Sequence, residues 1–339
     1  MRVRLVRGVA RVVLGVISVA GAGSLLVAQS PRSRGGGDTP PRVAADPFEQ
    51  QRLVKAMNDE VLLSRLTLLG IARKVRYRGA DGMMVPAYLF APSDTTVRRP
   101  VILLIHGGVH GDFSAGHGVV VAALVRQGYV VVAPEYRGST GYGRSFYDAI
   151  DYGGKEVEDC VDAIDWLAAT VPYADTARVG IFGWSHGGFI SVHAVLRYPQ
   201  RFRVAVAHVP VADLPTRMHT HPAWYHELFV QQPGFGAPVE ANPRPYLQRS
   251  LTTHVRELRI PVLVHAADND EDVFIIENHM LRDSMVAAGM DRKGLYTYRE
   301  WHNPPGGHSF SVLDTPQGRE SWVETTTFLA RYLRPVGRE

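Results

Sequence analysis

The sequence of 339 residues contains a single cysteine, Cys160. A lone cysteine forms no disulfide within the chain, and metal sites built from several cysteines are excluded with it. Cys160 shares an apolar stripe of helical spacing with Val157, Val161 and Ile164. We therefore predict that Cys160 is a buried small side chain and not a thiol nucleophile.

A strong charge of one sign is also missing. The 37 basic and 33 acidic residues give a net charge of +4, and Arg2, Arg4, Arg7 and Arg11 all precede the first acid, Asp38. Without these four arginines the two signs balance at 33 each (37 − 4 = 33). The remainder therefore shows no electrostatic footprint for nucleic acid, and we expect no such partner.

Long apolar runs are absent except near the N-terminus. Residues 12–28 carry no charge and follow the four arginines, which is typical of a secretory signal. We assign 1–29 to a signal peptide, with a retained N-terminal membrane anchor as the alternative, although the run is short for a span. Residues 30–47 are rich in Pro, Gly and Arg and are predicted to form a flexible linker. The expected location is the periplasm or the exterior, with membrane contact only if the leader is retained.

The rest of the chain alternates between two periodicities. The N-terminal segment 48–73 is predicted to be a helix, because its apolar residues have helical spacing up to residue 69. The strands 74–77 and 84–90 are predicted to flank a turn. In the domain 74–335, short apolar runs without alternation predict strands buried on both faces. The strands are expected at 101–105, 129–133, 179–182, 204–207, 262–264 and 295–300, and the helices at 119–127, 157–169, 187–198 and 277–288. This alternation predicts an α/β fold with a mostly parallel central sheet and helices on both faces.

One connection, about residues 210–260, is longer than the others and carries several aromatic residues. An insertion of this kind often covers a site as a lid. Trp224 and Tyr225 within it, together with Trp184, are the candidates for substrate binding. Alternatively, the aromatic side chains of the insertion only hold it against the domain.

A Gly-x-Ser-x-Gly motif spans Gly183 to Gly187, directly after a predicted buried strand and before a predicted helix. In that context the motif indicates a nucleophile elbow, which presents Ser185 above the carboxyl edge of the sheet. A serine needs a base, and the base needs an acid to orient it. In this fold the acid and then the histidine follow the serine along the chain.

Four acids crowd the loop after strand 262–264. We favour Asp270, because Val273 should anchor the next helix and fix the loop from its far end. Asp268 is the alternative, and Glu271 and Asp272 are expected to face solvent or to cap the start of the next helix.

Two histidines follow the last predicted strand. We favour His308 over His302 as the base, because Gly306 and Gly307 give its loop the freedom to fold back over Ser185.

The strand 101–105 runs into His106-Gly-Gly108. We expect the backbone N–H groups of Gly108 and His186 to form an oxyanion hole, and His106 to be structural. His219, His221 and His226 lie close together in the insertion but have no acid at clear ligand spacing. We therefore expect neither a metal nor a cofactor.

Several motifs together resemble the catalytic domain of the prolyl oligopeptidase family of serine peptidases, over about residues 74–333. They are Gly183-Trp-Ser-His-Gly-Gly188, His106-Gly-Gly108, Pro134-Glu-Tyr-Arg-Gly-Ser139, the segment 151–159 and Gly307-His-Ser-Phe310. The resemblance implies an α/β-hydrolase fold, a Ser-His-Asp triad and cleavage of peptides through an acyl-enzyme.

The sequence departs from the family pattern in three places. Val109 stands where the family often has proline, the acid loop holds one extra residue, and only residues 30–73 precede the hydrolase. Family members with defined peptide specificity usually carry an N-terminal β-propeller, for which that segment is too short. A carboxylesterase on the same machinery is therefore the main alternative, and a catalytically inactive binding protein is the second.

Overall fold

An eight-stranded sheet forms the centre of the computed structural model, which describes residues 46–335. Its strand order is β1-β2-β4-β3-β5-β6-β7-β8. β1 and β2 pair antiparallel, as do β2 and β4, and all the remaining neighbours are parallel. The strands are β1 (Gly70–Arg78), β2 (Met84–Pro92), β3 (Arg99–Ile105), β4 (Val130–Pro134), β5 (Ala174–Trp184), β6 (Val204–His208), β7 (Val262–Ala267) and β8 (Tyr296–Trp301). The predicted mostly parallel sheet of an α/β-hydrolase is confirmed.

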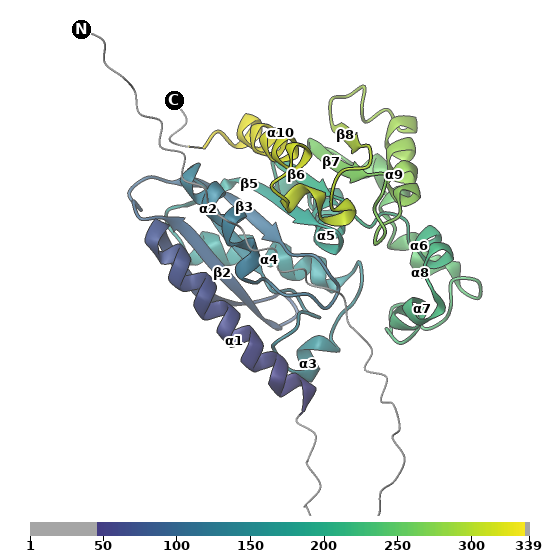
Figure 1. Ribbon diagram of the computed structural model, residues 1–339, viewed down its shortest axis with the longest axis horizontal. Coiled ribbons are helices and arrows are strands. Elements are labelled where there is room, and N and C mark those ends of the chain that lie inside the picture. The colour runs from purple at the N-terminus through teal and green to yellow at the C-terminus, as the bar shows by residue number, and fades with distance from the viewer. Residues whose placement is uncertain (1–45, 336–339) are drawn as a thin grey trace, which may run out of the picture. The chain divides into compact units, whose positions relative to one another are not determined.

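Helices cover both faces of the sheet, because the central strands are apolar on both sides (Figure 1). One face packs against α1 (Pro47–Leu66), α2 (Gly118–Arg126) and α10 (Pro316–Leu333). The other packs against α4 (Lys155–Thr170), α5 (His186–Arg197) and α9 (Ile275–Ala287). Cys160 is fully buried on α4, as predicted.

The long connection after β6 folds into short helices, which gather near α9 in Figure 1. They are α6 (Leu214–Thr220), α7 (Ala223–Val230) and α8 (Pro243–Gln248), followed by the 3₁₀ turns η4 (Leu251–Thr253) and η5 (Val255–Glu257). Phe229, Phe235 and Tyr246 are buried and their ring centroids lie 4.7–6.0 Å apart. These three aromatic residues therefore hold the insertion together.

The remaining short elements lie in the connections between strands. They are η1 (Thr67–Leu69), η2 (Ala115–His117), α3 (Arg144–Tyr147), η3 (Pro199–Arg201) and η6 (Gly307–Val312).

The segment 48–73 is not one helix, so that prediction is corrected. The helix α1 ends at Leu66, η1 follows, and residues 70–78 form β1. Gly70 has a φ of +148°, outside the helical region, and β1 pairs with β2 from that residue onward. Hydrogen bonding to β2 therefore places residues 70–73, which the prediction included in the helix, in a strand.

The face of α1 that points inward is also unexpected. Leu53 and Met57 are 62% and 69% exposed, whereas Lys55 and Asp59 are buried beside Leu62. The apolar spacing identified a helix correctly but did not identify the buried face, because polar partners for Lys55 lie elsewhere in the chain.

Helix α10 was not predicted from the sequence; its Leu329 and Leu333 are fully buried in the core. Within residues 46–335, no helix is long and apolar enough to cross a membrane. The predicted signal peptide, 1–29, and nearly all of the predicted linker, 30–47, lie outside the described residues.

Candidate active site

Ser185 occupies the sharp turn between β5 and α5. Its φ of 55° and ψ of −121° lie in a region that non-glycine residues rarely adopt and that costs about 1–3 kcal/mol. The Ser185 N–H donates to the carbonyl oxygen of His208 at 2.9 Å, and its own carbonyl accepts from the N–H of Phe189 at 2.9 Å. Backbone hydrogen bonds on both sides therefore hold the serine in this strained conformation.

Gly187 shows why the motif requires small residues. A Cβ atom at this position would lie 2.4 Å from the carbonyl oxygens of both Ile105 and His106. The first turn of α5 thus packs directly against the end of β3. This contact brings the serine turn and the loop after β3 together.

Asp270 and His308 form a pair. The Nδ1 atom of His308 lies 2.9 Å from Oδ1 and 2.8 Å from Oδ2 of Asp270. The same Oδ1 accepts the N–H groups of Asp272 and Val273, at 2.9 and 2.8 Å. Asp270 is only 4% exposed and Val273 is fully buried, as the loop argument predicted.

A second acid–histidine pair lies at the same edge of the sheet. Nδ1 of His302 contacts Oδ2 of Asp268, but the His302 side chain is 93% exposed. The His308 side chain is 21% exposed and that of Asp270 is 1% exposed. Glu271 and Asp272 are exposed, in agreement with the prediction.

The loop after β3, which carries one of the two predicted oxyanion-hole residues, begins beside the serine turn. A Cβ atom on Gly107 would lie 3.3 Å from the Cβ of Ser185, so the strand end and the serine are in near contact. Gly108 follows with a φ of +74°, and its carbonyl oxygen accepts from the hydroxyl of Tyr136 at 2.7 Å. The N–H of His186, as the first residue of α5, has no partner within the helix and lies at its positive dipole end.

The ring of His186 is buried below this turn, with its centroid 4.4 Å from that of Tyr152. Among the described residues neither ring nitrogen has a hydrogen-bond partner. Burial lowers the pKa of His186 well below its ordinary value. The neutral ring therefore fills space in the core.

The three substrate-binding candidates have different surroundings. Trp224 on α7 is 68% exposed. Tyr225 is 8% exposed, and its hydroxyl accepts from Nε of Arg217 at 2.7 Å. The indole N–H of Trp184 donates to Oγ of Ser311 at 3.2 Å, which ties β5 to the turn η6 that carries His308.

Arg217 supports the acid loop, and the sequence analysis did not identify it. This buried cation pairs with Glu277 at 2.9 Å and donates to the carbonyl oxygen of Asp272 at 3.2 Å. It thereby connects the insertion to the acid loop. No signal marks it in the sequence, because an isolated arginine in a connection is ordinary.

No group of three or more His, Cys, Asp and Glu side chains is arranged to hold a metal ion in the part of the chain that the structure describes. His219, His221 and His226 instead each contact a backbone carbonyl oxygen.

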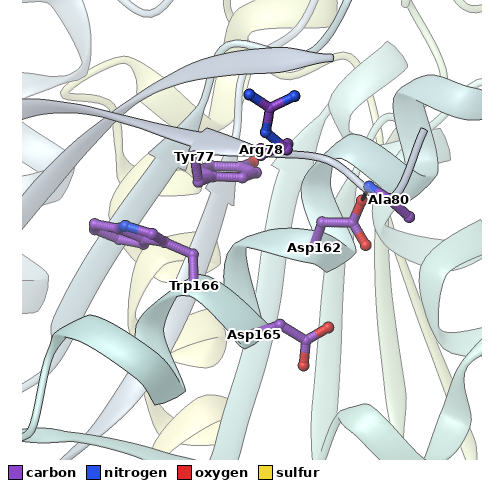
Figure 2. A pocket seen from close by; sticks show the side chains of 6 residues that line it. All are labelled: Tyr77, Arg78, Ala80, Asp162, Asp165 and Trp166. Atoms are coloured by element: carbon purple, nitrogen blue, oxygen red, sulfur yellow. Dashed lines mark hydrogen bonds between the residues drawn. The ribbon is translucent and has the colours of Figure 1, made fainter. Parts of the chain in front are cut away.

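A hollow of about 260 Å³ lies on the surface between β1 and α4, where the rings of Tyr77 and Trp166 stack (Figure 2). Its two carboxylates already have partners: Asp162 accepts the N–H of Ala80 at 2.7 Å and Asp165 pairs with Arg201 at 2.6 Å. None of the catalytic candidates lines this hollow.

The chain is similar in sequence to known peptidases. A dipeptidyl aminopeptidase BIII from Pseudoxanthomonas mexicana is 29% identical over 282 residues, covering 78% of this chain and 40% of its own length. The human acylamino-acid-releasing enzyme is 28% identical over 208 residues, covering 59% of this chain and 28% of its own length. This chain thus spans less than half the length of either relative.

The fold is shared with solved structures. A puromycin-hydrolysing peptidase of Mycobacterium tuberculosis superposes with a TM-score of 0.65 at 24% identity, covering 80% of this chain and 40% of that one. The acylaminoacyl peptidase of Pyrococcus horikoshii gives a TM-score of 0.67 at 18% identity, covering 83% and 44%. The profile of the prolyl oligopeptidase family matches residues 117–335, which is most of the chain. The chain therefore belongs to the prolyl oligopeptidase family of peptidases.

Proposed function

We propose that this protein is a serine peptidase in which Ser185, His308 and Asp270 act as a triad. The observation that carries the proposal is the strained Ser185 at the β5–α5 turn, on the same sheet edge as the Asp270–His308 pair. A strained serine at such a turn exposes its hydroxyl for attack on a carbonyl carbon.

The first half of the reaction forms an acyl-enzyme. His308 takes the proton of the Ser185 hydroxyl at Nε2 as the oxygen attacks the substrate carbonyl. Asp270 accepts the Nδ1–H of His308, which fixes the tautomer and stabilises the imidazolium. The N–H groups of Gly108 and His186 stabilise the oxyanion, and His308 then donates its proton to the leaving amine.

The second half releases the acid product. Water loses a proton to His308, attacks the acyl carbon and expels Ser185, which recovers its proton from His308. Besides the substrate and water, these steps need only groups that the chain itself supplies.

The substrate class follows from the relatives, whose names describe release of acylated amino acids and of dipeptides. We propose short peptides as substrates, with Trp224 as the exposed aromatic side chain of the insertion that is free to contact them. The same triad also hydrolyses esters, so we expect ester cleavage to be readily detectable beside peptidase activity.

A fluorophosphonate probe tests the mechanism, because it labels only an activated serine. The wild-type protein should be labelled at Ser185, and Ser185→Ala should lose both the label and about 10⁴-fold or more in kcat. Labelling that persists in Ser185→Ala would assign the nucleophile elsewhere. A wild-type protein that is not labelled would favour the inactive binding protein.

A panel of peptide anilides and p-nitrophenyl esters then tests the substrate class. Efficient cleavage of acylated or dipeptidyl anilides supports the peptidase. Cleavage of esters alone would favour the carboxylesterase.

We also propose that the N-terminal leader directs export of this enzyme. The support is the uncharged run 12–28 behind four arginines.

A further inference from the structure

Lys55 on α1 is buried among acceptors from the loop after β3 and from Glu135, which directly follows β4. Its Nζ lies 2.7 Å from Oε1 of Glu135 and 3.3 Å from Oδ2 of Asp112, and it donates to the carbonyl oxygen of Phe113. The side chain is 3% exposed. On its own helix it contacts Asp59 at 3.0 Å. Lys55 therefore joins α1 to the far end of the loop 106–114.

Glu135 extends this contact toward the proposed oxyanion hole. Its Oε1 also accepts the N–H of Phe113 at 3.1 Å, and its Oε2 lies 3.3 Å from Nε2 of His106. Glu135 itself is fully buried. One carboxylate thus lies against both ends of the loop that carries Gly108 and accepts a hydrogen bond from one of them.

His106 and Tyr136 complete the connection to Gly108. Their rings stack with centroids 4.3 Å apart, and the Tyr136 hydroxyl donates to the carbonyl oxygen of Gly108. The Nε2 of His106 also contacts Oγ of Ser139 at 3.0 Å, and its Nδ1 lies 3.0 Å from the carbonyl oxygen of Gly107. Glu135 thus contacts a ring that Ser139 and the backbone of Gly107 also contact, beside Ser185.

Lys55 is the ammonium partner of the buried Glu135 carboxylate in this cluster. Burial by itself raises the pKa of Glu135, but His106 and Lys55 outweigh it and lower the pKa to about 2. Burial lowers the pKa of Lys55, but the surrounding carboxylates raise it further than that. Without Lys55, a buried carboxylate would lose its ammonium partner close to the place where the oxyanion forms.

We propose that Lys55 is a positioning residue for the oxyanion hole, acting through Glu135 and the backbone of Phe113. This inference rests on the proposed function, and it adds a helix that lies outside the residues 117–335 matched by the family profile. Helix α1 is on this account part of the catalytic apparatus, although none of its side chains touches the substrate.

Three variants test the proposal by steady-state kinetics on one anilide and one ester. In Lys55→Met, kcat should fall about tenfold to a hundredfold with KM unchanged within twofold. That loss is smaller than the ~10²–10³ expected for deleting an oxyanion donor itself. In the double variant Lys55→Met/Glu135→Gln, a neutral amide replaces the Glu135 carboxylate that Lys55→Met leaves without its partner. Its kcat should lie between those of Lys55→Met and wild type.

Lys74→Met is the matched control. Lys74 on β1 pairs at 2.5 Å with Asp59, which lies on the same helix as Lys55. Lys74 contacts no residue of the loop 106–114 in the described structure. Both Lys55→Met and Lys74→Met should lower the melting temperature, but only Lys55→Met should lower kcat. If Lys55→Met does not fold, the double variant carries the test, and its kcat should be below that of wild type at unchanged KM.

The outcomes separate this inference from the proposed function. If the wild type is active and kcat is unchanged in folded Lys55→Met or in the double variant, the proposed role of Lys55 is wrong and the proposed function stands. A double variant with less activity than Lys55→Met would overturn the charge argument as well. A wild type that neither turns over substrate nor reacts with fluorophosphonate would overturn the proposed function, and this inference with it.

Discussion

The substitution Asp270→Asn separates the two acid–histidine pairs at the sheet edge. Oδ1 of Asp270 accepts two backbone N–H groups, from Asp272 and Val273, so the asparagine must keep its carbonyl oxygen at that position. Its NH₂ group then occupies the position of Oδ2, 2.8 Å from Nδ1 of His308. An NH₂ group donates and does not accept, so it selects the histidine tautomer with the proton on Nε2. That tautomer cannot take the proton of Ser185.

The expected loss in kcat is about 10⁴-fold, or about 5.4 kcal/mol of transition-state stabilisation at 1.36 kcal/mol per tenfold. The fold should survive, because both backbone hydrogen bonds to Oδ1 remain. We expect the melting temperature to change by no more than about 4 °C, the shift that about 1 kcal/mol produces in a domain of this size.

The assay is hydrolysis of a p-nitrophenyl ester by equal amounts of folded protein, with Asp268→Asn as the matched control. Asp268 contacts His302, whose side chain is 93% exposed, so that substitution should cost less than about tenfold. If Asp268→Asn is the more damaging of the two, the catalytic pair is Asp268 and His302, and the reasoning from burial is wrong.

Three further predictions concern folding, pH and export. Gly187→Ala should lower the free energy of unfolding by about 3 kcal/mol or more, because its Cβ would lie 2.4 Å from two backbone oxygens. In urea unfolding, the control Gly116→Ala, whose Cβ would meet nothing nearer than 3.7 Å, should stay close to wild type. Burial lowers the pKa of His117 to about 4, so between pH 6.5 and 4 the unfolded chain binds a proton that the native state does not. The free energy of unfolding should therefore fall by up to about 3 kcal/mol as the pH drops through that window, and an equal slope in His117→Gln would contradict this. N-terminal sequencing of the protein secreted by a bacterial host should find a start near residues 29–31, whereas a start at Val3 or Arg4 would show that the leader is retained.

The order of the strands and of the helices α2, α4, α5 and α9 between them could be predicted from the sequence, because it depends on short-range patterns. Continuous apolar runs such as 101–105 indicate strands that are covered on both sides. The placement of Ser185 follows equally from local sequence, since small residues on both sides of the serine permit the tight turn and its contact with β3.

Which of the distant acids and histidines form buried pairs could not be determined from the sequence. Four acids and two histidines share one sheet edge, and local sequence only ranks them. The exposures of His302 and His308 differ because the turn η6 packs into the fold through Phe310, which is fully buried, and through Ser311, which bonds to Trp184. Only the packing of the whole domain fixes that difference.

The inward face of α1 is the clearest case of a feature that tertiary structure decided. Its apolar residues have helical spacing, yet Leu53 and Met57 are exposed and Lys55 is buried. A buried ammonium is stable only where acceptors surround it, and those acceptors come from elsewhere in the chain: the carbonyl of Phe113, 58 residues away, and the carboxylate of Glu135. Sequence periodicity measures which residues prefer to leave water. The partners that make burying a charge favourable become neighbours only when the chain has folded.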